Sequence, residues 1–272
     1  LREHDRETPT TVNLMGLYNS VRAGDLARTV EVVSGDIYPT WGAPPGEADG
    51  MLHTVPANGD LFRNYAFTLS LYRGLAAPMR GRLTSGAGSL TTRRGSWLLM
   101  ESTPSHTNWH PVGAAKPEGA HLLSSLAAIA MDSASVQYFQ WRQGRGGWEQ
   151  FHGSVIKHDG STGRPFKAVT ELATSLNALT ALSEPTARTA GSEDDARPAP
   201  IAPKVPVARA AIILDNDSRW MISQASGPRN DGRRSPVETA MRHFQEISCR
   251  GVECDVVAPD TSLDGYSLVV LP

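Results

Sequence analysis

Residues 97–104 are Trp97-Leu98-Leu99-Met100-Glu101-Ser102-Thr103-Pro104, in which four large apolar side chains are followed directly by a carboxylate and a polar turn. A short, continuous apolar run of this kind is typical of a parallel strand that is buried on both faces. Glu101 would then lie at the carboxyl end of the strand, held rigidly and facing the connecting loops. The stretch therefore predicts a parallel α/β protein with a candidate catalytic acid at a strand end.

Other apolar runs in the first 182 residues alternate with helical stretches. Strands are predicted at 10–15, 30–33 and 136–141, and helices at 60–75, 120–131 and 166–182. This alternation favours a parallel sheet, as half of an eight-stranded barrel or as part of an open doubly wound sheet. Each predicted strand ends in polar or aromatic residues, namely Asn13, Asp36 with Tyr38, Glu101, and Arg142 with Gln143. This favours the barrel, because barrel active sites are built at the carboxyl ends of the strands.

The rest of the chain divides into a linker and a second unit. Residues 183–207 are rich in proline and poor in large apolar side chains, which predicts an extended linker between a first domain at 1–182 and a second at 208–272. The second domain has predicted strands at 210–214, 253–257 and 268–271 and an amphipathic helix at 237–249. It is therefore predicted to be an incomplete α/β unit. The Gly-, Ser-, Thr- and Arg-rich stretch Arg80–Arg94 is predicted to be a loop insertion.

The composition of the chain limits the classes of partner that it is expected to bind. The chain has 40% apolar and 20% charged residues and a net charge of −2, so it is globular and offers no electrostatic reason to bind nucleic acid or an anionic membrane. No apolar run approaches the roughly 20 residues of a membrane helix. Cys249 and Cys254 form neither a disulfide framework nor a zinc pattern, which favours a reducing compartment, the cytoplasm. We expect both ends of the sequence, Leu1 and Pro272, to be cut within a longer protein.

Glu101 is the strongest candidate for chemistry. Glycoside hydrolysis uses two carboxylates, which lie about 5–5.5 Å apart in the retaining mechanism, one as nucleophile and one as general acid/base. The structural alternative is that Glu101 caps the turn that follows it, together with Ser102 and Thr103. Tyr38 could orient the nucleophile through its hydroxyl, or it could simply belong to a turn that Asp36 and Pro39 shape.

A long loop after the fourth predicted strand carries further polar candidates. Glu149 and His152 could donate to or accept from sugar hydroxyls, or they could be solvated loop residues. Aromatic side chains, which can pack on the C–H faces of sugars or in the core, are dense around them: Trp109, Tyr138, Phe139, Trp141, Trp148 and Phe151. We expect Tyr138 and Trp141 to be at least partly structural. His106 and His110 are predicted to be loop histidines.

Several ordered motifs resemble glycoside hydrolase family 42 β-galactosidases. Residues 101–105 with Asn108, Trp109 and Pro111 resemble the family's nucleophile segment, and residues 138–143 resemble its last barrel strand. Residues 149–158, 13–16 and 36–39 continue the match. Residues 213–217, 255–257 and 263–270 resemble the family's flavodoxin-like trimerisation domain. The resemblance implies the C-terminal half of a (β/α)8 TIM barrel followed by a partial flavodoxin-like α/β domain.

The resemblance also implies roles. Glu101 would be the nucleophile that forms a covalent galactosyl-enzyme intermediate, and Tyr38 would lie beside it. Trp109 and Phe139 would wall the sugar subsite, and Glu149 and His152 would hydrogen-bond galactose hydroxyls. The substrate would be a β-galactoside and the complete protein a homotrimer. No cofactor is implied, since the zinc ligands of some relatives would lie outside this chain.

Departures from the family pattern keep alternatives open. The family's acid/base Glu follows an Asn, and no Asn-Glu pair occurs in this chain, so that residue would lie upstream and the chain alone would be inactive. The family's Ala-His-Gly-Ala-Asp run is replaced here by residues 130–134, Ala-Met-Asp-Ser-Ala. The alternatives are a non-catalytic remnant that binds sugar or serves in assembly, and an α-L-arabinopyranosidase of the same fold.

Overall fold

The computed structural model describes residues 3–5, 8–38, 61–78, 96–109, 115–182, 207–226 and 235–272. The predicted insertion at 80–94 and nearly all of the predicted linker at 183–207 lie outside these ranges, as do Pro39, His110 and Pro111. None of the described helices is long and apolar enough to span a membrane.

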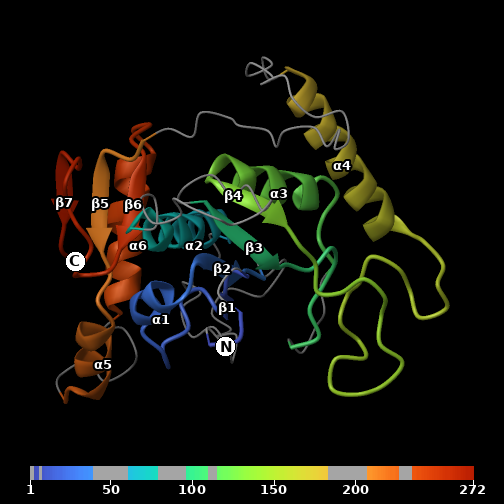
Figure 1. The fold of residues 1–272 in the computed structure, drawn as a ribbon, viewed down its shortest axis with the longest axis horizontal. Coiled ribbons are helices and arrows are strands. Elements are labelled where there is room, and N and C mark those ends of the chain that lie inside the picture. The colour runs from blue at the N-terminus through green and yellow to red at the C-terminus, as the bar shows by residue number, and fades with distance from the viewer. Residues whose placement is uncertain are drawn as a thin grey trace.

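The first domain contains a parallel four-stranded sheet in the order β1-β2-β3-β4. Its strands are β1 (Thr11–Leu14), β2 (Val32–Asp36), β3 (Trp97–Glu101) and β4 (Ser133–Val136). The helices that follow them are α1 (Ala23–Thr29), α2 (Leu61–Ala76), α3 (Ala120–Ala130) and α4 (Arg164–Leu182). Figure 1 shows the strands side by side with their carboxyl ends toward the same loops. The architecture is that of a partial barrel, as predicted.

Three details of this domain differ from the sequence-based prediction. The second strand was predicted at 30–33, but β2 covers Val32–Asp36. The fourth strand was predicted at 136–141 from its aromatic side chains, but β4 covers Ser133–Val136. Its small residues fit beside the fully buried Trp97, and the Ser133 hydroxyl accepts from the Leu99 amide at 2.9 Å. The aromatic residues follow the strand, where the Phe139 amide still donates to the Ser102 carbonyl. The short helix α1 was not predicted, because its seven residues carry little apolar periodicity.

The second domain contains a parallel three-stranded sheet in the order β6-β5-β7. Its strands are β5 (Ala210–Ile213), β6 (Cys254–Val257) and β7 (Leu268–Val270), and its helices are α5 (Asn216–Gln224) and α6 (Pro236–Ser248). The first strand is central and the next two flank it, which is the start of a doubly wound sheet of the flavodoxin type. The side chain of Ser235 caps α6 by accepting from the Glu238 amide.

Helix α2 joins the two domains into one packed body. It contacts β2 on one side and β6 and α6 on the other, and Figure 1 shows it between the two sheets. Phe67 of α2 meets Phe244 of α6 edge to face, with ring centroids 5.5 Å apart. One continuous apolar core therefore runs from the first sheet, through α2, into the second.

Candidate active site

Glu101 lies at the end of β3 with a donor on each carboxylate oxygen. The Tyr38 hydroxyl donates to its Oε2 at 2.6 Å, and the Asn13 Nδ2 donates to its Oε1 at 3.0 Å. Burial and the hydrogen bond to Glu101 raise the pKa of Tyr38, so this hydroxyl stays protonated and remains a donor. Because Asn13 ends β1 and Tyr38 follows β2, three neighbouring strands fix one carboxylate.

Asp36 is a second carboxyl group in this corner. The Asn13 amide also donates to Asp36 Oδ1, at 3.3 Å, so it bridges Asp36 and Glu101. Burial, and then the nearby charge of Glu101, raise the pKa of Asp36 to about 7, while the hydrogen bond from Asn13 opposes them. Near neutral pH the pair therefore carries less negative charge than two free carboxylates would.

Aromatic rings form a wall beside Glu101. Tyr38 meets Trp109 edge to face with ring centroids 4.6 Å apart, and His152 lies 5.4 Å from Trp109 and 5.0 Å from Phe139 by the same measure. The Trp109 Nε1 lies 3.4 Å from Glu149 Oε1. The structure thus brings all six predicted site residues into one connected group at the carboxyl ends of the strands.

The tautomer of His152 follows from its neighbours. Asn108 donates through Nδ2 to the Trp148 carbonyl at 2.7 Å, so its Oδ1, 3.2 Å from His152 Nδ1, is an acceptor. Burial, followed by the charge of His106, lowers the pKa of His152 to about 4, so the ring is neutral at physiological pH. With the proton on Nδ1, the buried Nε2 is an acceptor, and it makes no hydrogen bond within the described residues.

The loops that carry these residues are locked together by backbone contacts. The Gly153 amide donates to the His106 carbonyl at 2.8 Å, and a Cβ on Gly153 would lie 2.7 Å from backbone atoms of His106. His106 lies in a loop, as predicted, and its ring nitrogen Nε2 lies 2.9 Å from the Phe151 carbonyl oxygen in the second loop. Glycine is required at 153 for this close approach.

Some predictions for individual residues need correction or completion. Tyr138 contacts His121, with its hydroxyl 3.1 Å from Nε2, which agrees with a partly structural role. Trp141 was predicted to be partly structural but is 62% exposed, because it follows β4 instead of lying within it. Asn13, Asp36 and Asn108 were not predicted as site residues. The polar side chains at the ends of the first two strands were the available signal for Asn13 and Asp36.

Within the described ranges, no three His, Cys, Asp or Glu side chains are grouped closely enough to hold a metal ion. Cys249 is exposed, Cys254 is buried, and both are free.

Comparison with known proteins identifies the family. The glycoside hydrolase family 42 model, described as β-galactosidase, matches residues 1–179, and a model described as β-galactosidase trimerisation domain matches residues 208–272. The chain is 35% identical to β-galactosidase BglY of Alicyclobacillus acidocaldarius over 273 residues and 31% identical to β-galactosidase GalA of Bacillus licheniformis over 279 residues. These alignments cover 100% of this chain but only 33% and 34% of the relatives, so the chain spans about one third of their length.

Solved structures agree with this assignment. The cold-adapted β-galactosidase of Rahnella sp. R3 superposes with a TM-score of 0.75 at 33% identity, covering 100% of this chain and 33% of that one. Gan42B, a family 42 β-galactosidase, superposes with a TM-score of 0.72 at 28% identity over 100% of this chain and 34% of its own. This chain therefore belongs to glycoside hydrolase family 42.

Proposed function

We propose that the protein containing this chain is a retaining β-galactosidase and that Glu101 is its nucleophile. The observation that carries the proposal is the double anchoring of Glu101 by Tyr38 and Asn13 at a strand end, beside an aromatic wall. Two donors from separate strands hold the carboxylate in one orientation. Such preorganisation is what a displacement at a sugar carbon needs.

The reaction then proceeds in two displacements. An oxygen of Glu101 attacks the anomeric carbon, the glycosidic C–O bond breaks, and a general acid protonates the departing oxygen. Water next attacks the same carbon, its proton passes to the conjugate base of that acid, and the ester to Glu101 is broken. The acid/base carboxylate belongs, in this proposal, to a part of the protein beyond these 272 residues.

The residues around Glu101 would bind and orient the sugar. Trp109 and Phe139 present ring surfaces to C–H faces of galactose. His152 Nε2, a buried acceptor without a partner in the described part of the chain, fits a sugar hydroxyl. Glu149, near the Trp109 ring nitrogen, would accept from another hydroxyl. The same proposal includes a homotrimer assembled through the second domain and a cytoplasmic location.

The test uses the protein expressed from the whole open reading frame. A 2-deoxy-2-fluoro-β-galactoside with a dinitrophenyl leaving group should label one peptide, the one containing Glu101, by the mass of a fluorogalactosyl group. Glu101→Gln should abolish labelling and reduce kcat on an aryl β-galactoside by several orders of magnitude. Exposed Glu118→Gln is the matched control and should keep wild-type kinetics.

Two results would contradict the assignment. One is a Glu101→Gln enzyme with a kcat within about tenfold of wild type, because loss of a nucleophile costs far more than the 1.36 kcal/mol that a tenfold change represents. The other is label on a different residue. The encoded sequence upstream of Leu1 should also contain an Asn-Glu pair at the end of a further barrel strand; a stop codon there would favour a non-catalytic remnant.

A further inference from the structure

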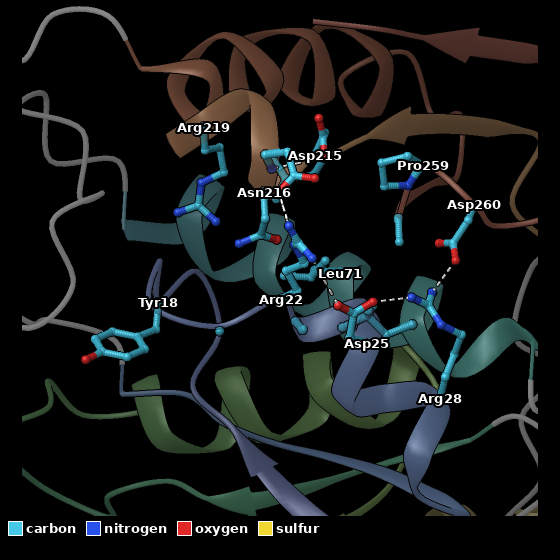
Figure 2. A pocket seen from close by; sticks show the side chains of 17 residues that line it. Tyr18, Arg22, Asp25, Arg28, Leu71, Asp215, Asn216, Arg219, Pro259 and Asp260 are labelled. Atoms are coloured by element: carbon cyan, nitrogen blue, oxygen red, sulfur yellow. Dashed lines mark hydrogen bonds and ion pairs between the residues drawn. The ribbon is translucent and has the colours of Figure 1, made fainter. Parts of the chain in front are cut away.

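A cavity of about 400 Å³ lies between the two domains, and Figure 2 shows the side chains around it. It lies at the carboxyl ends of β5 and β6, the edge where open α/β sheets usually bind ligands. Its described charges are mostly paired with one another, Arg22 with Asp217 at 2.5 Å and Arg28 with Asp260 at 2.6 Å. The loop that follows β1 in the first domain also lies at this edge.

Three side chains of helix α5 donate hydrogen bonds to backbone carbonyls of that loop. Arg219 Nη2 donates to the Leu17 carbonyl at 2.7 Å, and Trp220 Nε1 donates to the Asn19 carbonyl at 2.6 Å. Asn216 Nδ2 donates to the Val21 carbonyl at 3.1 Å. Because alternate carbonyls are bound over five consecutive residues, the path of the loop backbone is fixed by the second domain.

Burying the charged side chain of Arg219 at this position costs folding free energy. Its side chain is 6% exposed, and it has no carboxylate partner in the described ranges. Burial lowers its pKa to about 10, which still leaves it charged at neutral pH. A buried cation without a counter-charge loses hydration that one carbonyl restores only in part. What the charged guanidinium provides at this position is a strong hydrogen-bond donor to the Leu17 carbonyl.

The loop that α5 binds follows β1, which contains Asn13, one of the two residues that hydrogen-bond to Glu101. The Tyr72 hydroxyl of α2 lies 2.5 Å from both the Gly16 amide and the Leu14 carbonyl, so the start of the loop is bound as well. Leu14 is adjacent to Asn13, whose amide donates to Glu101. Side chains of α5 and α2 therefore hold the backbone from Leu14 to Val21, which directly follows Asn13, one of the two anchors of Glu101.

We propose that α5 of the second domain is a positioning element for the nucleophile: by holding the carbonyls of Leu17, Asn19 and Val21, it keeps Asn13 on Glu101. The role of Glu101 in this inference rests on the function proposed above. The second domain would then contribute to the chemical step within its own subunit, in addition to assembly. Arg219, Trp220 and Asn216 are positioning residues, since they touch neither substrate nor Glu101.

The experiment compares Trp220→Phe and Arg219→Met with Met221→Ala, an exposed α5 variant, in the protein expressed from the whole open reading frame. Trp220→Phe keeps an aromatic ring beside Arg22 but removes the donor to Asn19. Amide hydrogen exchange of the peptides that cover residues 9–22 should accelerate in both test variants and not in the control. The rate constant for labelling by the fluorogalactoside should fall about tenfold, as expected for one lost hydrogen bond that acts on the transition state.

Two further readouts separate positioning from general damage. The inhibitor concentration at half-maximal labelling rate should be unchanged, because the sugar-contacting residues are untouched. The thermal midpoint of Arg219→Met should equal or exceed that of the wild type, because the change removes a buried charge that has no carboxylate partner among the described residues. A labelling rate that falls only in proportion to a falling thermal midpoint would overturn the inference.

Failure of the proposed function gives a different result. If the wild-type protein takes up no label, the nucleophile assignment fails, while hydrogen exchange still reports whether α5 holds the β1 loop. Unchanged exchange in both variants overturns the inference even when the enzyme is fully active. Accelerated exchange with an unchanged labelling rate also overturns it, because the loop would then move without affecting Glu101.

Discussion

Asp36, which lies next to Glu101, has a pKa well above the ordinary value of an aspartate. Its carboxyl group shares the Asn13 amide with Glu101, and its pKa is raised to about 7 by burial and by the charge of Glu101. In the unfolded chain the same group would titrate near 3.8. Between these two values the folded protein holds a proton that the unfolded chain releases, so folding stability is linked to pH.

This linkage predicts the sign of a pH effect. The stability gained from the protonated Asp36 is complete below about pH 4 and is lost as the pH rises through 7. Asp36→Asn, which cannot ionise, should therefore flatten the decline of the thermal midpoint between pH 5 and pH 8. Calorimetry of both proteins across this range measures the difference. Parallel midpoint curves for the two proteins would show that Asp36 does not titrate in this window.

Individual site residues were predictable where their type was unusual for their position. Glu101, directly after a buried apolar strand, has few structural reasons to be there, and Tyr38 follows a strand in the same way. Asn108 offers no such signal, because an asparagine in a loop is ordinary. Its role, fixing the proton on His152 Nδ1, depends on a contact across 44 residues that no local pattern encodes.

At the scale of elements, the long helices were predicted well from the sequence, and the short elements were predicted poorly. The helices α2, α3, α4 and α6 were predicted close to their observed bounds. The position of strand β4 was predicted wrongly, because its buried position beside Trp97 is a serine, Ser133, and the strand has no large apolar run. Helix α5 was missed: its capping Asp215 is a signal, but its three side-chain hydrogen bonds to the first domain leave no apolar pattern in the sequence.

Helix α2 shows how a single glycine sets the distance between elements. A Cβ at Gly74 would lie 2.1 Å from the Val256 carbonyl oxygen on β6, a backbone atom that cannot turn aside. In an exposed helix, Gly→Ala stabilises by about 1 kcal/mol. At this position, Gly74→Ala should instead destabilise by about 1–3 kcal/mol, the usual cost of overpacking.

Urea unfolding measures that change, with Gly146→Ala as the control. A Cβ at Gly146 would meet no atom within 4 Å, so this variant should unfold as the wild type does. Equal or greater stability of Gly74→Ala would mean that α2 and β6 can separate without loss, which would contradict their close packing.

At the scale of the whole molecule, a buried ion pair joins the domains. Arg73 of α2 is 1% exposed and donates through Nε to Asp255 of β6 at 2.6 Å. Its Nη1 reaches Glu253 at 2.9 Å, and the Tyr266 hydroxyl donates to the other Asp255 oxygen at 2.8 Å. The Tyr266 bond lies within the second domain, whereas the two Arg73 bonds exist only when the domains are docked. The bonds of Arg73 therefore offset part of the cost of burying its charge and make the pair a determinant of docking geometry.

Removing one partner should cost far more than removing both. Asp255→Asn leaves the Arg73 charge partly uncompensated in the interface and should lower the free energy of unfolding by about 3–5 kcal/mol. The double variant Arg73→Met with Asp255→Leu replaces the pair by apolar side chains and should recover most of that loss. The surface pair of Arg28 and Asp260 is the control, since its side chains are 42% and 57% exposed and Arg28→Gln should cost about 0–1 kcal/mol.

Urea unfolding of the four proteins measures these differences, and the shape of the transition adds a second readout. If the uncompensated Arg73 charge opposes docking, Asp255→Asn should split a single transition into two, because each domain then unfolds by itself. The double variant should restore one transition, since the apolar contact of α2 with β6 and α6 remains. A double variant as unstable as Asp255→Asn would show that the charged pair itself, and not relief from an unpaired charge, holds the two domains together.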